Sequence, residues 1–425
     1  MKKILTSIIL CSVLVVGVFA LGACGTLQDN TAYAVVAEGR LSSDGFYYDV
    51  YENNTAAIRG VEDTSVQQLT IPEKVDGYPV TSIGERAFRD HEQLLYVKMS
   101  GNIKTIGREA FAGCKSLVRV DLGGKVHTLE TDAFYCCNML CEVNGTESLQ
   151  KIGSSCFFQC GSLCFIELGE ALKSIGDQAF FGCVALSSVK LPESLIELGD
   201  GAFSYCDALA IAELGGITYV PDNTFEKCVS LTVVNIGDSV TSIGENAFRG
   251  CVKLSDVTIG KKVSYIASSA FEQTAWIDGQ KEEFLIVGDG ILLSYNGTAA
   301  NVVIPSGVKR IADAFCANET IRSVEIGAKV EEIGDYAFSS CPQLSRVTIT
   351  GNVKNIGANA FSTCTALTTI YLPASLESVA PNAFLNCSGL GNVSYAGTAS
   401  AWSKIKVEKG NEFLLISTIN YSQKP

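Results

Sequence analysis

The chain has 425 residues, enough for two or three globular domains or for one long repetitive body. Apolar residues make up 47% of it and charged residues only 18%, a composition that excludes a disordered linker protein. The formal net charge of −13 would repel a polyanion, and no basic tract offsets it, so we expect no nucleic-acid partner.

The first predicted element, residues 1–23, is a secretory signal. Two lysines precede an apolar run from Ile4 to Leu21, and small residues follow it. This order of charge and then apolar residues is typical of such signals. An uncleaved membrane anchor is the alternative, because about 18 apolar residues are the lower limit for spanning a bilayer.

The letters LGAC at residues 21–24 resemble the bacterial lipobox. In that motif the cysteine is acylated and becomes the new N-terminus, so the resemblance implies lipidation of Cys24 and favours the cleaved signal. Diacyl anchoring holds a protein firmly at a membrane surface. We therefore expect an extracytoplasmic protein, lipid-anchored to the bacterial cell membrane at the cell surface, with a polar tether over residues 24–44.

A twelve-residue motif, VTSIGENAFRGC at residues 240–251, recurs along the rest of the chain. Thirteen copies follow one another at intervals of 23 residues, occasionally 22, with a single gap of 44. A fixed period of about 20–50 residues is typical of a solenoid, in which each turn buries its apolar face only against its neighbours. Every copy holds a phenylalanine, and we expect these rings to form one continuous stacked column: Phe88, Phe111, Phe134, Phe157, Phe180, Phe203, Phe225, Phe248, Phe271, Phe315, Phe338, Phe361 and Phe384.

Two other features of the repeat have a physical reason. A glycine after an aliphatic residue, present in eight copies, suits a bend where a side chain would crowd the adjacent turn. The segment after the motif, as in Cys251 to Ile259, has the pattern LxxVxI, which alternates apolar and polar residues and predicts a short strand. The predicted fold is a repeat solenoid of mostly short parallel β-strands, with turns and short helical turns, about thirteen rungs, capped at both ends.

The boundaries of this solenoid follow from the motif copies. We expect an N-terminal cap over 45–68, repeat arrays over 69–274 and 304–393, and a C-terminal cap over 394–425. The segment 275–303 lacks the phenylalanine motif and contains VGDGILLSYNGT, which predicts a hairpin. We expect this interruption to bulge from the rod or bend it without dividing it.

The repeat resembles the leucine-rich repeat, specifically the BspA-like class of bacterial cell-surface proteins with 23-residue repeats. The resemblance covers the chain from about Gly45 to Tyr421 and includes both end segments. It implies adhesion or recognition, with an extracellular or host protein as partner. Two alternatives stay open at this point: a structural envelope protein with no dedicated ligand, and a repeat scaffold with a cysteine-based metal or redox role.

Seventeen cysteines would ordinarily suggest disulfides in a secreted chain. Ten of them lie three residues after a motif phenylalanine, where we expect a small buried slot with the thiol bonded to the backbone. Cys141 and Cys164 are 23 residues apart and should be neighbours on adjacent turns. The spacings between Cys136 and Cys164 lack the paired CxxC of structural zinc sites, so we expect no metal and no cofactor.

Catalytic signals are weak. The chain has two histidines, of which His91 fills the cysteine slot of the first copy and His127 lies between copies. Neither has a separate thiol beside it that could act as an activated nucleophile. No phosphate loop, HExxH or GxSxG motif occurs. We therefore expect a protein that is not an enzyme.

Binding is the function that a solenoid surface favours. The third and fifth residues of the LxxVxI pattern should face the concave side, where leucine-rich repeat proteins usually hold partners. Most of these residues are polar, but three apolar ones fall within four consecutive turns. An apolar patch with a polar rim often marks a protein contact, which makes the candidate ligand-binding residues Phe165, Glu167, Ile211, Glu213, Val233 and Asn235. The alternative is that the three are isolated surface hydrophobes or are covered by the interruption.

Overall fold

The computed structural model describes residues 33–424. The predicted signal over 1–23 and the predicted lipidation site Cys24 lie outside the described residues. Part of the predicted tether over 24–44 is folded, because Val35–Leu41 forms strand β1. This strand pairs antiparallel with β2 (Phe46–Tyr51), which pairs antiparallel with β3 (Ala56–Val61). The N-terminal cap therefore begins about ten residues before the predicted boundary at 45.

Each regular turn of the chain contributes two strands, one on each side of the rod. The LxxVxI segments form the outer strands: β4 (Gln68–Thr70), β7 (Tyr96–Lys98), β9 (Arg119–Asp121), β11 (Glu142–Asn144), β14 (Ser188–Lys190), β16 (Ile211–Glu213), β18 (Val233–Ile236) and β20 (Asp256–Ile259). The residues before the phenylalanine turn form the inner strands: β6 (Tyr78–Ile83), β8 (Thr105–Ile106), β10 (Thr128–Leu129), β12 (Lys151–Ile152), β13 (Ser174–Ile175), β15 (Glu197–Leu198), β17 (Tyr219–Val220), β19 (Ser242–Ile243) and β21 (Tyr265–Ile266). Strand β5 (Lys74–Val75) pairs antiparallel with β6.

The second array repeats this arrangement. Its outer strands are β24 (Asn301–Val303), β26 (Ser323–Ile326), β28 (Arg346–Ile349), β30 (Thr369–Leu372), β32 (Asn392–Tyr395) and β34 (Thr418–Tyr421). Its inner strands are β25 (Arg310–Ile311), β27 (Glu332–Ile333), β29 (Asn355–Ile356), β31 (Ser378–Val379) and β33 (Lys406–Val407). Neighbouring strands of one kind pair in parallel, one turn apart, except where a sheet ends, as between β11 and β14. The chain is a parallel β-solenoid, as the period predicts.

The number of turns is larger than predicted. Thirteen turns hold a motif phenylalanine, and three further outer strands, β4, β24 and β34, belong to turns without one. The solenoid therefore has about 16 turns. The predicted thirteen was too small because it counted only copies that carry the phenylalanine.

The glycine of the motif allows neighbouring turns to approach closely on the inner side. A Cβ atom added to Gly199 would lie 2.3 Å from the amide nitrogen of Asp177, in the preceding turn. The Gly199 amide donates to the carbonyl of Ile175 at 2.8 Å, a contact that most turns repeat. In the next turn Pro221 occupies the position of this glycine, and proline has no backbone N–H to donate. At that turn the hydroxyl of Tyr219 donates to the carbonyl of Leu198 at 3.3 Å instead.

The thirteen motif phenylalanines lie in the interior, each at most 3% exposed. From Phe88 to Phe271 neighbouring ring centroids are 5.1–5.6 Å apart in stacked geometry, and from Phe315 to Phe384 they are 4.8–5.3 Å apart. The predicted single column is therefore two columns. Trp276 packs edge-on against Phe271 at 4.9 Å, and Tyr295 packs against Phe315 at 4.8 Å.

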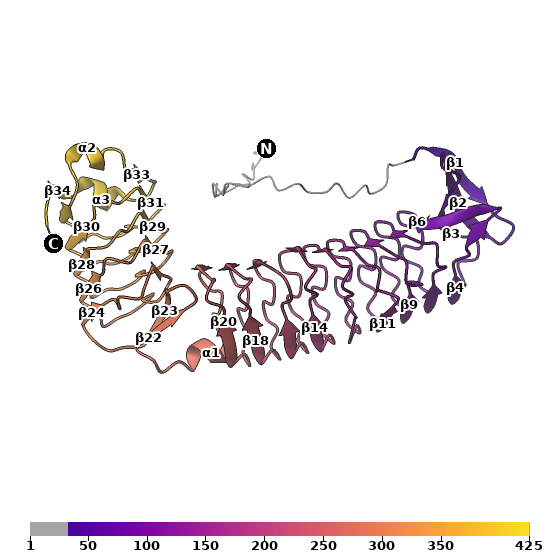
Figure 1. The fold of residues 1–425 in the computed structure, drawn as a ribbon, viewed down its shortest axis with the longest axis horizontal. Helices are drawn as coiled ribbons and strands as arrows, with labels where there is room; N and C mark the ends of the chain where they lie inside the picture. The colour runs from indigo at the N-terminus through magenta and orange to yellow at the C-terminus, as the bar shows by residue number, and fades with distance from the viewer. Residues whose placement is uncertain (1–32, 425) are drawn as a thin grey trace, which may run out of the picture.

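The interruption produces this break. It contains the helix α1 (Ala275–Asp278) and the antiparallel hairpin β22 (Phe284–Val287) and β23 (Ile291–Tyr295), as VGDGILLSYNGT predicts. The buried side chains of Ile291 and Leu293 belong to the core of the first array, and that of Leu292 belongs to the core of the second. The rod bends at this point (Figure 1). The expectation of a bend is met, but the core is divided into two clusters.

The C-terminal cap first continues the solenoid and then closes its end. Helices α2 (Ala399–Trp402) and α3 (Glu412–Ile416) replace the last turns, while β33 and β34 still pair in parallel with the preceding strands. Asn411 and Leu414 are almost completely buried and cover the end of the core.

Candidate recognition surface

The structure places the six candidate ligand-binding residues on the outer side of the first array, all exposed. The three apolar side chains of Phe165, Ile211 and Val233 are 56%, 55% and 46% exposed. Ile211 and Val233 are paired across β16 and β18, and Glu213 and Asn235 are paired beside them. The interruption segment does not cover these residues, because their exposure is high.

Phe165 is more distant from the other two. It lies in the turn between those of β11 and β14, and Ser188 of β14 separates it from Ile211. Lys190 of the same strand forms an exposed ion pair with Glu213 at 3.7 Å, which contributes little to stability. The structure therefore brings together an apolar pair, and a third aromatic side chain two turns away, with acidic and amide groups on their rim.

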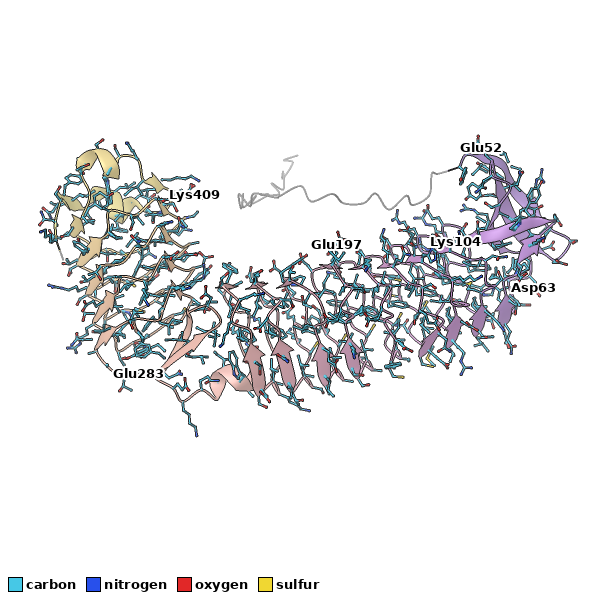
Figure 2. All side chains as sticks on the ribbon, in the orientation of Figure 1. Glu52, Asp63, Lys104, Glu197, Glu283 and Lys409 are labelled. Carbon is cyan, nitrogen blue, oxygen red and sulfur yellow. The ribbon has the colours of Figure 1, made fainter. Side chains whose placement is uncertain are left out.

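The prediction that these residues face the concave side of the rod is wrong. Figure 1 shows the outer strands β14, β18 and β20 along the convex edge of the bend, and the inner strands β27, β29, β31 and β33 on the concave side. Figure 2 shows Lys104 and Glu197 projecting on the concave side as well. The candidate patch is on the convex face.

The concave side has its own exposed apolar residues, which the sequence analysis did not single out. Ile196 is 67% exposed beside β15, and Tyr219 and Tyr265 of β17 and β21 are 41% and 39% exposed. The signal that could have found them is the pair of positions two and three residues before the motif glycine position, which is polar in most copies.

A second aromatic column on the surface was also missed. Tyr135 and Phe158 stack at 5.0 Å, Phe158 and Phe181 stack at 4.8 Å, and Tyr205 follows at 5.1 Å. The ammonium of Lys227 lies 4.9 Å from the Tyr205 ring centroid. The letters AFY, CFF and AFF, with an aromatic residue directly after the motif phenylalanine, are the signal. Because the ring faces contact one another, this column supports the turns and presents mainly ring edges to solvent.

The outer face opens between β11 and β14. Strand β11 ends one four-stranded sheet and β14 begins the next, and the segment between them, Cys164–Leu168, is not part of a strand. A cleft of 460 Å³ lies there, lined by residues 141–147 and by Cys164, Phe165 and Glu167. Two candidate residues, Phe165 and Glu167, are therefore on the wall of a concavity that the sequence did not predict.

One residue departs from the repeat pattern beside this opening. Gly145 occupies the position that is Leu122 one turn earlier, so the third apolar anchor of the strand is missing. Gly145 has φ of 76°, in the left-handed region that favours glycine. A Cβ at this position would lie 2.8 Å from the amide nitrogen of Gly124, so only glycine fits.

The ten repeat cysteines form a ladder of thiol hydrogen bonds. Each donates from Sγ to the carbonyl oxygen of the motif phenylalanine one turn earlier, at 3.0–3.3 Å. All ten are buried and unbridged. Burial raises the pKa of Cys251 and of Cys387 to about 12, which keeps these thiols protonated. The structure thus gives the slot that the spacing predicts.

Cys141 and Cys164 are neighbours on adjacent turns and are not bridged. The Sγ of Cys164 lies 3.8 Å from the carbonyl oxygen of Cys141, and the Sγ of Cys141 lies 3.4 Å from that of Val118. Each thiol therefore points to the backbone of the preceding turn. Across residues 33–424 no group of three or more histidine, cysteine or acidic side chains is placed to hold a metal ion.

His91 lies in a cleft at the N-terminal end of the array. Its imidazole is 9% exposed, and neither ring nitrogen has a hydrogen-bond partner within the described part of the chain. Burial lowers the pKa of His91 from its ordinary value of 6.5, and the nearby Asp63 carboxylate opposes this in part. The 500 Å³ cleft beside it is lined by charged side chains of both signs: Arg59, Arg89, Asp90 and Glu92.

These turns, with their aromatic column and thiol ladder, define a leucine-rich repeat solenoid, a fold that generally serves as a binding scaffold without catalysis. The model of the BspA type leucine rich repeat region matches residues 61–183, 150–277 and 293–404, in six copies. The chain belongs to this family.

Several solved structures are similar to the chain. A leucine-rich repeat protein from Bacteroides ovatus is 23% identical, with 86% of this chain and 89% of that chain covered and a TM-score of 0.49. A leucine rich cell surface protein from Faecalibacterium prausnitzii is 27% identical, with 86% and 97% covered and a TM-score of 0.43. The pneumococcal vaccine antigen PcpA is 17% identical, with 91% and 98% covered and a TM-score of 0.34. No curated protein matches the sequence.

Between residues 33 and 424 no helix is long and apolar enough to cross a bilayer.

Proposed function

We propose that this protein recognises another protein at the bacterial cell surface, through the convex patch formed by Phe165, Glu167, Ile211, Glu213, Val233 and Asn235. The observation that carries the proposal is the exposure of three large apolar side chains, 46–56%, on turns whose outer strands are otherwise mostly polar. An apolar centre with a polar rim is the composition of protein interfaces. An extracellular or host protein is the proposed partner.

The charge and the rigidity of the rod are also consistent with a protein partner. The net charge of −13 disfavours nucleic acid, and the rod holds the patch on a rigid array of paired strands. Rigid presentation lowers the entropy lost on binding. The patch needs no metal or cofactor for this role.

Lipid anchoring through Cys24 is part of the proposal. The supporting observations are the apolar run from Ile4 to Leu21 and the LGAC letters that end it. Growth of the expressing bacterium with an alkyne analogue of palmitate tests it. Label should appear on the wild-type protein and be lost in Cys24→Ser, and label retained by the variant would contradict the assignment.

The recognition role is tested with the double variant Phe165→Asp with Val233→Asp. Full-length protein purified in detergent is passed over immobilised, purified mammalian extracellular-matrix proteins, and the dissociation constant is measured by surface plasmon resonance. A partner that binds the wild type should bind the double variant at least tenfold more weakly, because hot-spot side chains carry most of an interface energy.

A matched control is available in the second array. Thr348→Asp with Thr369→Asp places the same charges on neighbouring outer strands, β28 and β30, outside the patch. This control should keep the wild-type affinity. Equal loss in both variants, or no loss in the patch variant, would contradict the proposed surface.

A further inference from the structure

The cleft on the outer face is an interruption of backbone pairing. No amide of the segment Cys164–Leu168 donates a hydrogen bond to another described residue, and the carbonyls of 165–168 accept none. The adjacent strands β11 and β14 each end a sheet, so their edges toward this segment are also unpaired. Edges of this kind are templates for pairing with another chain.

The opening is confined to the outer side of the rod. The inner strands of the same two turns, β12 and β13, pair in register at Ile152 and Ile175. In the interior, the rings of Phe134 and Phe157 remain stacked at 5.4 Å. The turns are thus held together behind the cleft, which makes it a stable feature of the fold.

The cleft is acidic. Among its lining residues are three carboxylates, from Glu142, Glu147 and Glu167, and no lysine or arginine. Only Glu142 forms an ion pair within the described chain, with Arg119 at 2.6 Å. Two carboxylates at the cleft are therefore without a cation, in a protein whose net charge is already −13.

Two side chains of the cleft complete this arrangement. Thr146 is 4% exposed, lines the cleft, and makes no side-chain hydrogen bond with another described residue. Phe165 is 56% exposed on the opposite wall. The Thr146 hydroxyl is therefore available to a ligand or water at the cleft wall, and an exposed aromatic ring attracts both apolar groups and cations.

We propose that this cleft receives an extended, lysine- or arginine-rich segment of a partner protein. The inference deepens and rests on the proposed function, since it names the chemistry of the partner. The segment's backbone pairs with the free amides and carbonyls of 164–168 or of the β11 edge. Its cationic side chains face Glu147 and Glu167, and an alternate side chain packs on Phe165.

The test uses random dodecapeptides displayed on phage, selected on the full-length protein. Enriched peptides should carry lysine or arginine at alternate positions. Synthetic copies, measured by fluorescence anisotropy, should bind at least tenfold more weakly to Glu147→Gln with Glu167→Gln and to Phe165→Ala. The control Asp256→Asn with Glu325→Gln removes the same charge from the exposed outer strands β20 and β26, outside both the cleft and the patch, and it should keep the affinity within twofold.

Three results would overturn the inference: no enrichment, enriched peptides without basic residues, or an equal loss of affinity in the control. Its failure can be told apart from failure of the proposed function. If matrix-protein binding is lost in Phe165→Asp with Val233→Asp but kept in Glu147→Gln with Glu167→Gln, the patch binds a partner and the cleft does not. If neither variant changes that binding, both assignments fail.

Discussion

The side-chain carbonyl oxygen of Asn411 accepts a hydrogen bond from the backbone amide of Phe384 at 2.9 Å. In the preceding turns the amide of the motif phenylalanine donates to a backbone carbonyl of the next turn, as Phe361 does to Ala383 at 2.8 Å. Phe384 is the last motif phenylalanine, and Asn411 replaces the carbonyl that a further turn would supply. Its amide nitrogen also donates to the carbonyls of Ala380 and Glu408, at 2.9 and 2.8 Å.

We predict that Asn411→Ala destabilises the C-terminal end of the solenoid by about 1–3 kcal/mol, because it leaves buried backbone groups without partners. Hydrogen exchange of the amides around Phe384 measures this locally, and urea unfolding measures the whole array. The exposed Asn420→Ala serves as the control, with an expected change within about 0.5 kcal/mol. Equal effects of the two variants would show that Asn411 does not close the core.

The cysteines should separate by reactivity in the native protein. Cys164 and Cys316 are exposed, whereas the ten ladder thiols are buried and bonded to carbonyls. Burial, with the Asp313 and Glu272 carboxylates, raises the pKa of Cys316, so it should react more slowly than Cys164. Iodoacetamide at pH 8 followed by peptide mass spectrometry should label Cys164 first and the ladder only after denaturation. Labelling of Cys183 at the rate of Cys164 would contradict the ladder.

The stability of the N-terminal end should depend on pH through His91. Because burial lowers its pKa below 6.5, the unfolded chain takes up a proton that the folded chain does not as the pH falls through this value. Stability is therefore fully present above pH 6.5 and is lost below it. The midpoint temperature of thermal unfolding should therefore decrease as the pH is lowered from 7.5 to 5.5.

His91→Cys is the matched variant, since cysteine fills the same slot in ten other turns. Its thermal midpoint should fall less over the same pH interval than that of the wild type. Identical pH profiles for the two proteins would mean that the imidazole is already protonated, or solvated, in the fold.

Much of the architecture could be predicted because the repeat encodes local contacts that every turn uses again. The period, the motif phenylalanines and the cysteine slot predict the parallel solenoid and its interior, and Ile291 to Tyr295 form the hairpin strand that their sequence indicates. Positions that depart from the repeat were less predictable. Trp276 and Tyr295 divide the column, and β1 joins the cap, through contacts between segments that share no periodic pattern.

The site was predictable only in part. Alternation in the LxxVxI pattern placed Phe165, Ile211 and Val233 on the surface correctly, because side chains of a strand alternate between core and solvent. It could not place them on the convex side, since the direction of curvature depends on how all the turns stack along the rod and not on the alternation within one strand. The cleft beside Phe165 accompanies one missing apolar anchor, at Gly145, and the loss of strand pairing there appears only in the folded chain.

The central claim is that the motif phenylalanines hold the fold, while the convex patch is a surface independent of it. Thermal unfolding followed by circular dichroism tests this with Phe180→Ala, a ring that is 0% exposed and stacked at 5.2 and 5.1 Å, beside Phe165→Asp with Val233→Asp. Phe180→Ala should cost about 3–5 kcal/mol and lower the midpoint clearly. The surface double variant should cost no more than about 1 kcal/mol. Unfolding of the surface variant, or a wild-type midpoint for Phe180→Ala, would contradict the account.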